Sequence, residues 1–182
     1  MHVEQKGQEN QSQREILVYL MEEYGDMVLR VAYTYVKEQH LAEDISQEVF
    51  IRCYHALHTF ERRSSYKTWL YRITVNQCKD YVKSWSFRKL FPKSIIETES
   101  DKEVNSVSTH VLKKEENNEL FEKVLQLPVK QREVIIFYYY EDLSIDEISE
   151  VIKAKPNTIK SRLHRARNSL KDQIGGGIIL EE

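Results

Sequence analysis

Glycine, proline and cysteine are scarce in this chain, and each shortage excludes a class of structure. Five glycines and three prolines among 182 residues, with 41% hydrophobic residues, indicate a folded and mostly helical protein. The two cysteines, Cys53 and Cys78, lie in apolar helical patterns and are predicted to be reduced core residues of a cytoplasmic protein. No apolar run is long enough to span a bilayer. Residues 1–13 are polar, without the apolar centre of a signal peptide, and are expected to be disordered.

Patterns that indicate an enzyme are missing as well. The chain has no phosphate-binding glycine loop and no nucleophile elbow. A zinc site could be sought at Cys53, His55, His58 and Cys78. It is disfavoured, because the offset of two residues does not place Cys53 and His55 on one helix face and no paired-cysteine motif is present. We therefore predict a protein that is not an enzyme and needs no metal, cofactor or small-molecule substrate.

Acidic residues are absent from Lys153 to Lys171, although the formal net charge of the chain is -2. Residues 143–167 around this segment are typical of two short helices joined by a tight turn. Ser144 and Glu147 form a capping box at the start of the first helix. Pro156 suits the first position of the second helix, where a missing N–H costs nothing. The pattern predicts a helix–turn–helix.

The second helix has an apolar stripe and a cationic face. The stripe repeats at three and four residues and consists of Ile159, Leu163, Ala166 and Leu170. The opposite face carries Lys160, Ser161, His164 and Arg165, with Arg162, Arg167 and Lys171 on its flanks. A solvated basic face is the simpler interpretation of such a helix. The capped helix–turn–helix favours contact with the DNA major groove instead.

An earlier amphipathic helix, residues 40–57, carries a mixed acidic and apolar face. Its inward side is expected to hold Leu41, Ile45, Val49, Cys53 and Ala56. A separate side carries Asp44, Gln47, Glu48 and Ile51. Acidic side chains on a helix are usually only solvated. The isoleucine among them favours a protein-binding face, because interfaces combine an apolar centre with a polar rim.

A polar loop and a basic ridge follow. The loop, residues 60–67, contains Arg62, Arg63, Ser64, Ser65, Tyr66 and Lys67, which suit the capture of an unstacked base. The next helix carries Arg72, Asn76, Lys79 and Lys83 along one ridge, which suits a phosphate backbone, with Asn76 free to bond a base edge. Trp69 has apolar neighbours and is predicted to belong to the core rather than to a stacking platform.

The order of these patterns predicts an all-α protein of two small helical domains. The first spans residues 14–85, within which Gly25 marks a break or a close contact. Residues 86–117 lack a convincing apolar stripe and are predicted to form a flexible linker. The second domain spans residues 118–174. Two domains on a tether fit this pattern better than one compact core.

Several segments resemble one family, in the order in which that family carries them. Leu-Pro-Val-Lys-Gln-Arg-Glu-Val (127–134), Tyr-Tyr-Glu-Asp-Leu-Ser-Ile-Asp-Glu-Ile (139–148) and Thr-Ile-Lys-Ser-Arg-Leu-His-Arg-Ala-Arg (158–167) resemble the C-terminal domain of extracytoplasmic-function sigma factors of bacterial RNA polymerase. Ala-Glu-Asp-Ile-Ser-Gln-Glu-Val-Phe (42–50) and Thr-Trp-Leu-Tyr-Arg-Ile-Thr-Val-Asn (68–76) resemble their N-terminal domain.

The resemblance implies a sigma region 2 bundle, a sigma region 4 helix–turn–helix and a role for each surface. Asp44, Gln47, Glu48 and Ile51 would dock on the beta-prime clamp of core RNA polymerase. The residues that would capture and melt the minus-ten promoter element are Arg62, Arg63, Ser64, Ser65, Tyr66, Lys67, Arg72, Asn76 and Lys79. Those that would read the minus-thirty-five element are Thr158, Lys160, Ser161, His164 and Arg165. Arg162 and Arg167 are assigned to phosphates or internal ion pairs.

The resemblance also implies partners. Region 4 would lie at the beta flap, the linker would run toward the RNA exit path, and an anti-sigma factor, often membrane-anchored, would hold the protein inactive. The family commonly has glycine where this chain has Lys153. A conventional helix–turn–helix regulator, which binds duplex DNA as a dimer without polymerase, is the alternative.

Overall fold

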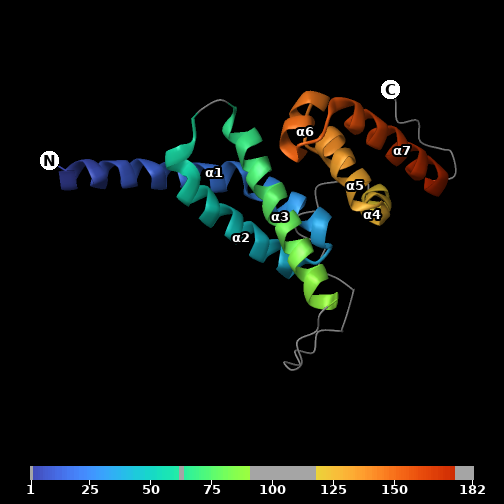
Figure 1. The fold of residues 1–182 in the computed structure, drawn as a ribbon, viewed down its shortest axis with the longest axis horizontal. Helices are drawn as coiled ribbons and strands as arrows, with labels where there is room; N and C mark the ends of the chain where they lie inside the picture. The colour runs from blue at the N-terminus through green and yellow to red at the C-terminus, as the bar shows by residue number, and fades with distance from the viewer. Residues whose placement is uncertain (1, 62–63, 91–117, 175–182) are drawn as a thin grey trace.

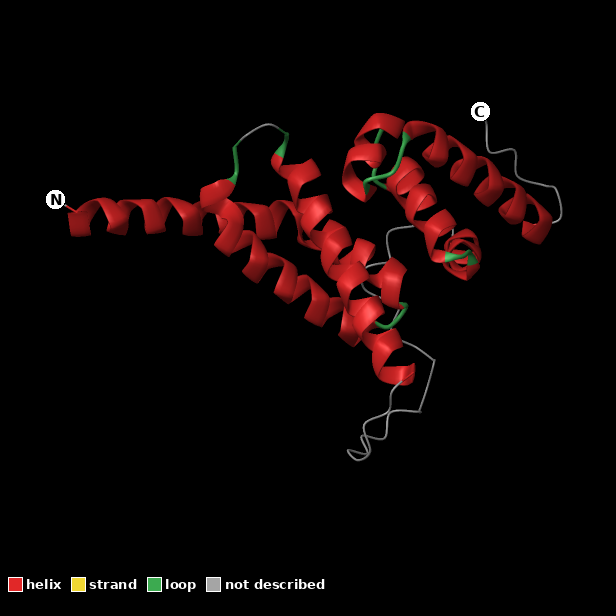
Figure 2. Ribbon diagram, viewed as in Figure 1, coloured by secondary structure: helices red, strands yellow, loops and turns green. Residues whose placement is uncertain are grey.

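The computed structural model describes residues 2–61, 64–90 and 118–174, and within these ranges all regular structure is helical (Figure 2). The N-terminal half contains α1 (His2–Val36), α2 (Gln39–Ala56), the 3₁₀ turn η1 (Leu57–Thr59) and α3 (Tyr66–Leu90). The C-terminal half contains α4 (Asn118–Gln126), α5 (Val129–Ile135), the π-helical turn η2 (Ile136–Tyr140), α6 (Ile145–Ile152) and α7 (Pro156–Ile174). The all-α prediction is confirmed. None of the helices in the described ranges is both long and apolar enough to cross a membrane.

The first half is a bundle in which α1, α2 and α3 pack on one another (Figure 1). Its core is apolar and fully buried at positions such as Val28, Val31, Val49 and Leu70. The α1–α2 connection is short, and the Glu38 carboxylate in it caps α2 by accepting hydrogen bonds from the backbone N–H groups of His40 and Leu41, at 2.9 and 2.8 Å. The bundle holds α2 and α3 side by side, with one face of each exposed.

Two expectations for α1 are wrong. The helix begins at His2, although residues 1–13 were expected to be disordered, because Gln, Glu and Lys are good helix formers that extend the packed part of α1. The helix also passes through Gly25 without a break. A Cβ atom at Gly25 would meet no atom within 4 Å, so no close contact requires this glycine.

The second half is organised around the helix–turn–helix. In α6 both hydrogen bonds of the predicted capping box form between Ser144 and Glu147. The α6 helix then ends at Lys153, whose φ of 54° is left-handed, and α7 begins at Pro156 as predicted. The predicted stripe of α7, Ile159, Leu163, Ala166 and Leu170, is buried. The sequence pattern and the structure agree closely in this segment.

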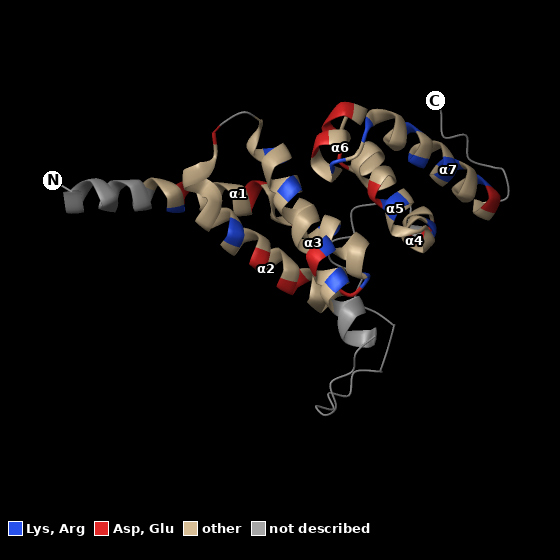
Figure 3. Ribbon diagram, viewed as in Figure 1, with Lys and Arg blue, Asp and Glu red and all other residues tan. Residues whose placement is uncertain are grey.

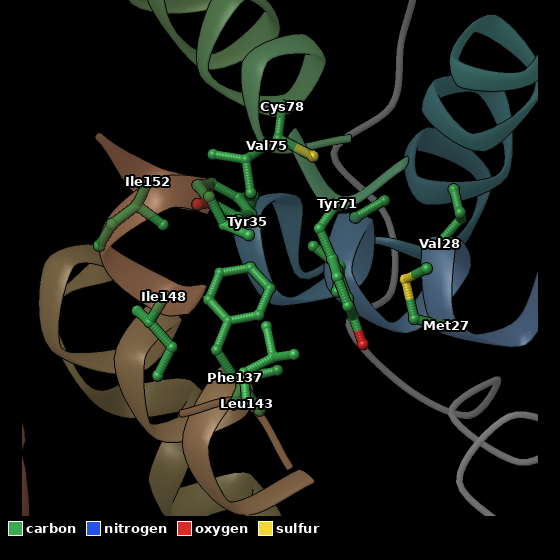
Figure 4. Close-up of a cluster of buried hydrophobic side chains, with 14 of the residues drawn as sticks. Met27, Val28, Tyr35, Tyr71, Val75, Cys78, Phe137, Leu143, Ile148 and Ile152 are labelled. Carbon is green, nitrogen blue, oxygen red and sulfur yellow. The ribbon is translucent and has the colours of Figure 1, made fainter. Parts of the chain in front are cut away.

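The two helical domains predicted from the sequence are both present, and in this structure they pack on each other. Helix α3 packs on α6, and α1 packs on α5. Figure 4 shows Tyr35, Tyr71 and Val75 of the first half facing Phe137, Ile148 and Ile152 of the second. The Tyr71 and Phe137 rings meet edge to face, with centroids 5.4 Å apart. Most of the predicted linker lies in residues 91–117, outside the described ranges, whereas α3 continues past Trp85 to Leu90.

Candidate nucleic-acid interface

Helix α7 presents the predicted minus-thirty-five residues to solvent. Thr158, Lys160, Ser161, His164 and Arg165 are all exposed, on the side of α7 opposite its buried stripe. Ser161 Oγ donates to the Asn157 carbonyl at 2.8 Å, and a His164 ring nitrogen lies 3.2 Å from the Asn168 amide. These bonds run along the helix surface and leave the face open. Figure 3 shows basic positions along α7.

The two arginines that flank this face, Arg162 and Arg167, make contacts with other residues of the protein. Arg162 Nη1 donates to Glu133 Oε1 at 2.9 Å. Arg167 Nε donates to the Tyr139 hydroxyl at 2.8 Å, and its guanidinium lies 5.8 and 5.7 Å from the Tyr138 and Tyr139 ring centroids. The internal ion pair is confirmed for Arg162. Arg167 makes a cation–π contact instead.

Two residues of the predicted minus-ten loop, Arg62 and Arg63, lie outside the described residues. Ser64 Oγ accepts a hydrogen bond of 2.6 Å from Arg72, which anchors the loop to α3. Ser65 is exposed and caps α3 by accepting from the Thr68 backbone N–H at 3.1 Å. These bonds fix how the loop enters the helix.

An aromatic cluster supports the base of this loop. Tyr66 stacks on Phe60 with ring centroids 4.5 Å apart, and Trp69 lies 5.0 Å from Phe60. All three rings are half-buried, and those of Tyr66 and Trp69 pack against the core. The core assignment of Trp69 is therefore confirmed in part, because one side of the ring belongs to this cluster near the surface.

The basic ridge of α3 divides between two environments. Asn76 is exposed, and Arg72 turns toward the loop with its Nε atom buried and unpaired. Lys79 turns toward the C-terminal half, where its Nζ lies 3.4 Å from Glu133 Oε2. Lys67 turns the same way, donating to the Glu141 carbonyl at 3.4 Å while lying over the Tyr71 ring. Helical spacing alone placed Arg72, Asn76 and Lys79 together, and tertiary packing separates them.

The predicted polymerase-binding residues share one outer side of α2. Asp44 and Gln47 are exposed, and Ile51 exposes 53% of its surface. Glu48 is partly covered by Arg52, which donates to it at 3.1 Å. An exposed isoleucine of this size, surrounded by acids and amides, has the composition of an interface centre.

Three buried charged residues escaped the sequence reasoning: Arg132, Glu133 and Glu141, which are only 4%, 4% and 6% exposed. Arg132 donates to the backbone carbonyls of Leu127 in the second half and Thr34 in the first. A signal was available, because Arg132 and Glu133 directly precede the apolar run that starts at Val134. Charges inside a buried stretch are found almost only when they are paired.

Burial also shifts the pKa of several groups in the core and where the two halves pack. Desolvation, followed by the adjacent Glu133 carboxylate, raises the pKa of Tyr35 well above its ordinary value. Desolvation and Glu141 raise the pKa of Tyr71 in the same way, so both hydroxyls remain protonated donors. Burial raises the pKa of the Cys53 and Cys78 thiols to about 12, which agrees with reduced, unreactive core cysteines.

Comparison with known proteins supplies matches to both halves. Residues 20–87 match the family model described as Sigma-70 region 2, and residues 118–170 match Sigma-70, region 4. The chain is 32% identical over 158 residues to the ECF RNA polymerase sigma factor SigW of Bacillus subtilis, covering 83% of this chain and 84% of that protein. It is 31% identical over 155 residues to the ECF RNA polymerase sigma factor SigM of the same organism, covering 85% and 93%.

A solved structure shares the fold. The sigma factor RpoE of Bartonella quintana, in a complex with the anti-sigma factor NepR, superposes with a TM-score of 0.66 at 21% sequence identity. The match covers 89% of this chain and 96% of the RpoE chain, so it includes both helical halves.

Proposed function

The chain belongs to the extracytoplasmic-function sigma factors of RNA polymerase, and from this membership and the surfaces above we propose how it selects a promoter. It binds core RNA polymerase and directs transcription initiation at promoter DNA. We propose that α7 reads the minus-thirty-five element, that α3 and the loop before it capture the minus-ten element, and that α2 docks on the beta-prime clamp. The protein would supply recognition and no catalysis, and it would act in the cytoplasm with the polymerase.

One observation carries the assignment of α7. The helix buries an apolar stripe on one side and exposes a continuous polar and basic face on the other, directly after a capped α6. A major groove accepts a helix of this kind, because its side chains reach the base edges while the preceding helix positions it. Lys160 and Arg165 supply donors for guanine, and Thr158 and Ser161 supply hydroxyls.

The α2 and α3 assignments depend on exposure and chemistry. Asp44, Gln47 and Ile51 form an acidic and amide rim around an apolar centre, which suits a basic, partly apolar partner surface. On α3, Asn76 is exposed on the ridge. Ser65 lies just before the start of α3, and Tyr66 begins the helix as part of the aromatic cluster. Hydroxyls and rings of this kind bind unstacked bases by hydrogen bonding and stacking.

Reconstituted transcription tests the proposal. Core RNA polymerase is incubated with a panel of promoters, with and without the purified protein, and transcript start sites are mapped. We expect new, protein-dependent starts at a subset of promoters. Unchanged start sites across the panel, together with no binding to core polymerase, would contradict the proposal. Binding of this protein alone to duplex DNA as a dimer would favour a conventional regulator instead.

We also propose that an anti-sigma factor regulates this protein, as NepR accompanies the RpoE neighbour. Affinity capture of the tagged full chain from cells would identify it. We expect to recover polymerase subunits and, in addition, a smaller inhibitor protein. Recovery of polymerase alone under all growth conditions would contradict regulation by an anti-sigma factor.

A further inference from the structure

The exposed face of α7 contains two side chains that hydrogen-bond along the helix itself. Ser161 Oγ lies 2.8 Å from the carbonyl oxygen of Asn157, four residues back. His164 Nε2 lies 3.2 Å from the amide nitrogen Nδ2 of Asn168, four residues ahead. Residues three and four apart share one side of a helix, so these four residues form a single polar row. All four are exposed, and the row therefore faces any DNA that α7 binds.

A hydrogen bond along the helix fixes what the rest of each side chain can offer to a base. The Asn157 carbonyl can only accept, so the Ser161 hydroxyl donates its proton there and offers lone pairs to DNA. The opposite holds at His164. The amide NH₂ of Asn168 can only donate, so Nε2 of the neutral ring accepts and the ring proton is on Nδ1. Ser161 therefore offers an acceptor, and His164 offers a donor.

The cations of the same face have no such choice. Lys160 and Arg165 carry only donors, whatever surrounds them. A neutral imidazole carries one donor and one acceptor, and the bond made by one ring nitrogen decides which role the other takes. Among the described residues, Asn168 is the one whose side chain bonds the His164 ring. The base preference of His164 thus depends on this neighbour.

We propose that Asn168 is a positioning residue for promoter recognition, which holds His164 in the tautomer that presents Nδ1–H to the minus-thirty-five element. This inference rests on the proposed function of α7. In the major groove a ring donor pairs with guanine N7 or O6, adenine N7 or thymine O4. A ring acceptor pairs instead with the amino group of adenine or cytosine. Asn168 therefore helps to select a base that it does not itself touch.

The substitution Asn168→Asp reverses the hydrogen bond with almost no change of shape. A carboxylate can only accept, so Nε2 must then carry the proton and Nδ1 of the neutral ring becomes the acceptor. Asn168→Ala removes the bond altogether. The matched control is Gln173→Glu, which adds the same charge at an exposed position of α7 outside the polar row. Circular dichroism checks that each variant keeps its helices.

Nitrogen-15 NMR of the imidazole rings in the full chain measures the tautomer. Spectra are recorded at about pH 8.5, where an ordinary imidazole is neutral. His164→Ala identifies the His164 signals, and the exposed His58 of η1 is the reference ring. We expect the proton on Nδ1 in the parent chain and in Gln173→Glu, on Nε2 in Asn168→Asp, and distributed as in the reference ring in Asn168→Ala. A parent ring that carries its proton on Nε2, or that matches the reference ring, would overturn the inference.

Reconstituted transcription measures the effect on specificity. Core polymerase and each variant transcribe, at the same pH, a promoter library randomised across the minus-thirty-five element. His164→Ala identifies the base pair that His164 reads. At that base pair we expect Asn168→Asp to shift the preference toward adenine or cytosine by about fivefold or more, the discrimination supplied by one base contact. Gln173→Glu should keep the parent preference. A uniform loss of transcription in Asn168→Asp, with every preference unchanged, would overturn the inference.

Failure of this inference and failure of the proposed function give different results. The NMR measurement uses the protein alone, whereas transcription requires polymerase and promoter DNA. If His164→Ala changes the promoter profile and the Asn168 variants do not, α7 keeps its function and Asn168 has no part in specificity. If no promoter responds to the protein, or if His164→Ala changes no preference, the proposed role of α7 fails at this residue and the inference fails with it.

Discussion

The two basic helices of the chain, α3 and α7, leave their cations in different situations. On α7, Lys160 and Arg165 extend into solvent from a face that none of the described elements covers. On α3, Lys67 and Lys79 contact the C-terminal half, and Lys79 pairs with a buried carboxylate. The two helices look equally suited to DNA in the sequence. Their difference shows that a basic residue is available to a nucleic acid only if the fold gives it no stronger partner.

The largest effect is expected from a substitution that removes the support of the open face. Leu163 is 2% exposed and packs under the cationic side of α7. Leu163→Ala should lower the free energy of unfolding by about 2–5 kcal/mol, through lost burial and the cavity it leaves. Denaturant unfolding measures this. Lys160→Ala, on the opposite side of the same helix, should stay within about 0.5 kcal/mol, and equal losses would contradict the division of α7 into two faces.

Next in size is the effect of removing a cation from each helix. Arg165→Ala should weaken discrimination at the minus-thirty-five element by about 1–3 kcal/mol, as expected for one lost base contact. Lys79→Ala should cost less, because Lys79 already pairs with Glu133 and supplies at most a phosphate contact. Competition among promoter variants in reconstituted transcription measures both changes. Lys171→Ala, at the exposed end of α7, is the control, and a larger effect for Lys79 than for Arg165 would break the comparison.

A smaller effect is expected at the cap of α6, which sets the position of α7. Ser144→Ala should cost about 1 kcal/mol of stability, because it leaves the Glu147 backbone N–H without its acceptor. The hydrogen bonds from Ser144 hold the pKa of Glu147 below its ordinary value of 4.5. Their contribution is present above that pH and lost as the pH falls through the lowered pKa.

Thermal unfolding at a series of pH values measures this cap. The difference between the parent chain and Ser144→Ala should be largest near neutral pH and should shrink in acid. A difference that grows as the pH falls would contradict the role of the Glu147 carboxylate in the cap.

The smallest effect, a gain, is expected in the turn between α6 and α7. Lys153 has a φ of 54°, a left-handed conformation that a Cβ atom disfavours. Lys153→Gly should raise stability by about 1 kcal/mol or less, since relief of strain exceeds the added freedom of the unfolded chain. Calorimetry measures it, with Lys155→Gly as the control at a neighbouring exposed position. A loss of stability at Lys153 would show that the turn is not strained.

Local patterns predicted the second half well for a physical reason. Three features depend on residues only a few positions apart: the capping box of Ser144 and Glu147, the start of α7 at Pro156, and the buried stripe that contains Leu163. Helical geometry turns such short spacings directly into contacts. The family roles of these residues followed from the resemblance, and they remain predictions for the individual bases.

Contacts between distant residues could not be predicted in the same way. Glu133 finds Tyr35 and Lys79, and Glu141 finds Arg30 and Tyr71, across separations that no periodicity encodes. The helical spacing of Arg72, Asn76 and Lys79 was predicted correctly, but Lys79 turns toward the second half, where it pairs with Glu133. The helical state of residues 2–13 was missed because a polar composition suits both a solvated helix and a disordered segment.

The π-helical turn Ile136–Tyr140 sets the direction, about the helix axis, in which the residues after it point. The backbone N–H of Glu141 bonds to the carbonyl of Ile136 at 3.1 Å, five positions back, so this turn holds one residue more than an α-helical turn. Each residue advances an α-helix by about 100°, so deleting one residue here would swing Glu141 a quarter-turn away from Arg30. Inserting or deleting a single residue in this turn would therefore change which residues meet where the two halves pack, with no substitution among those residues themselves.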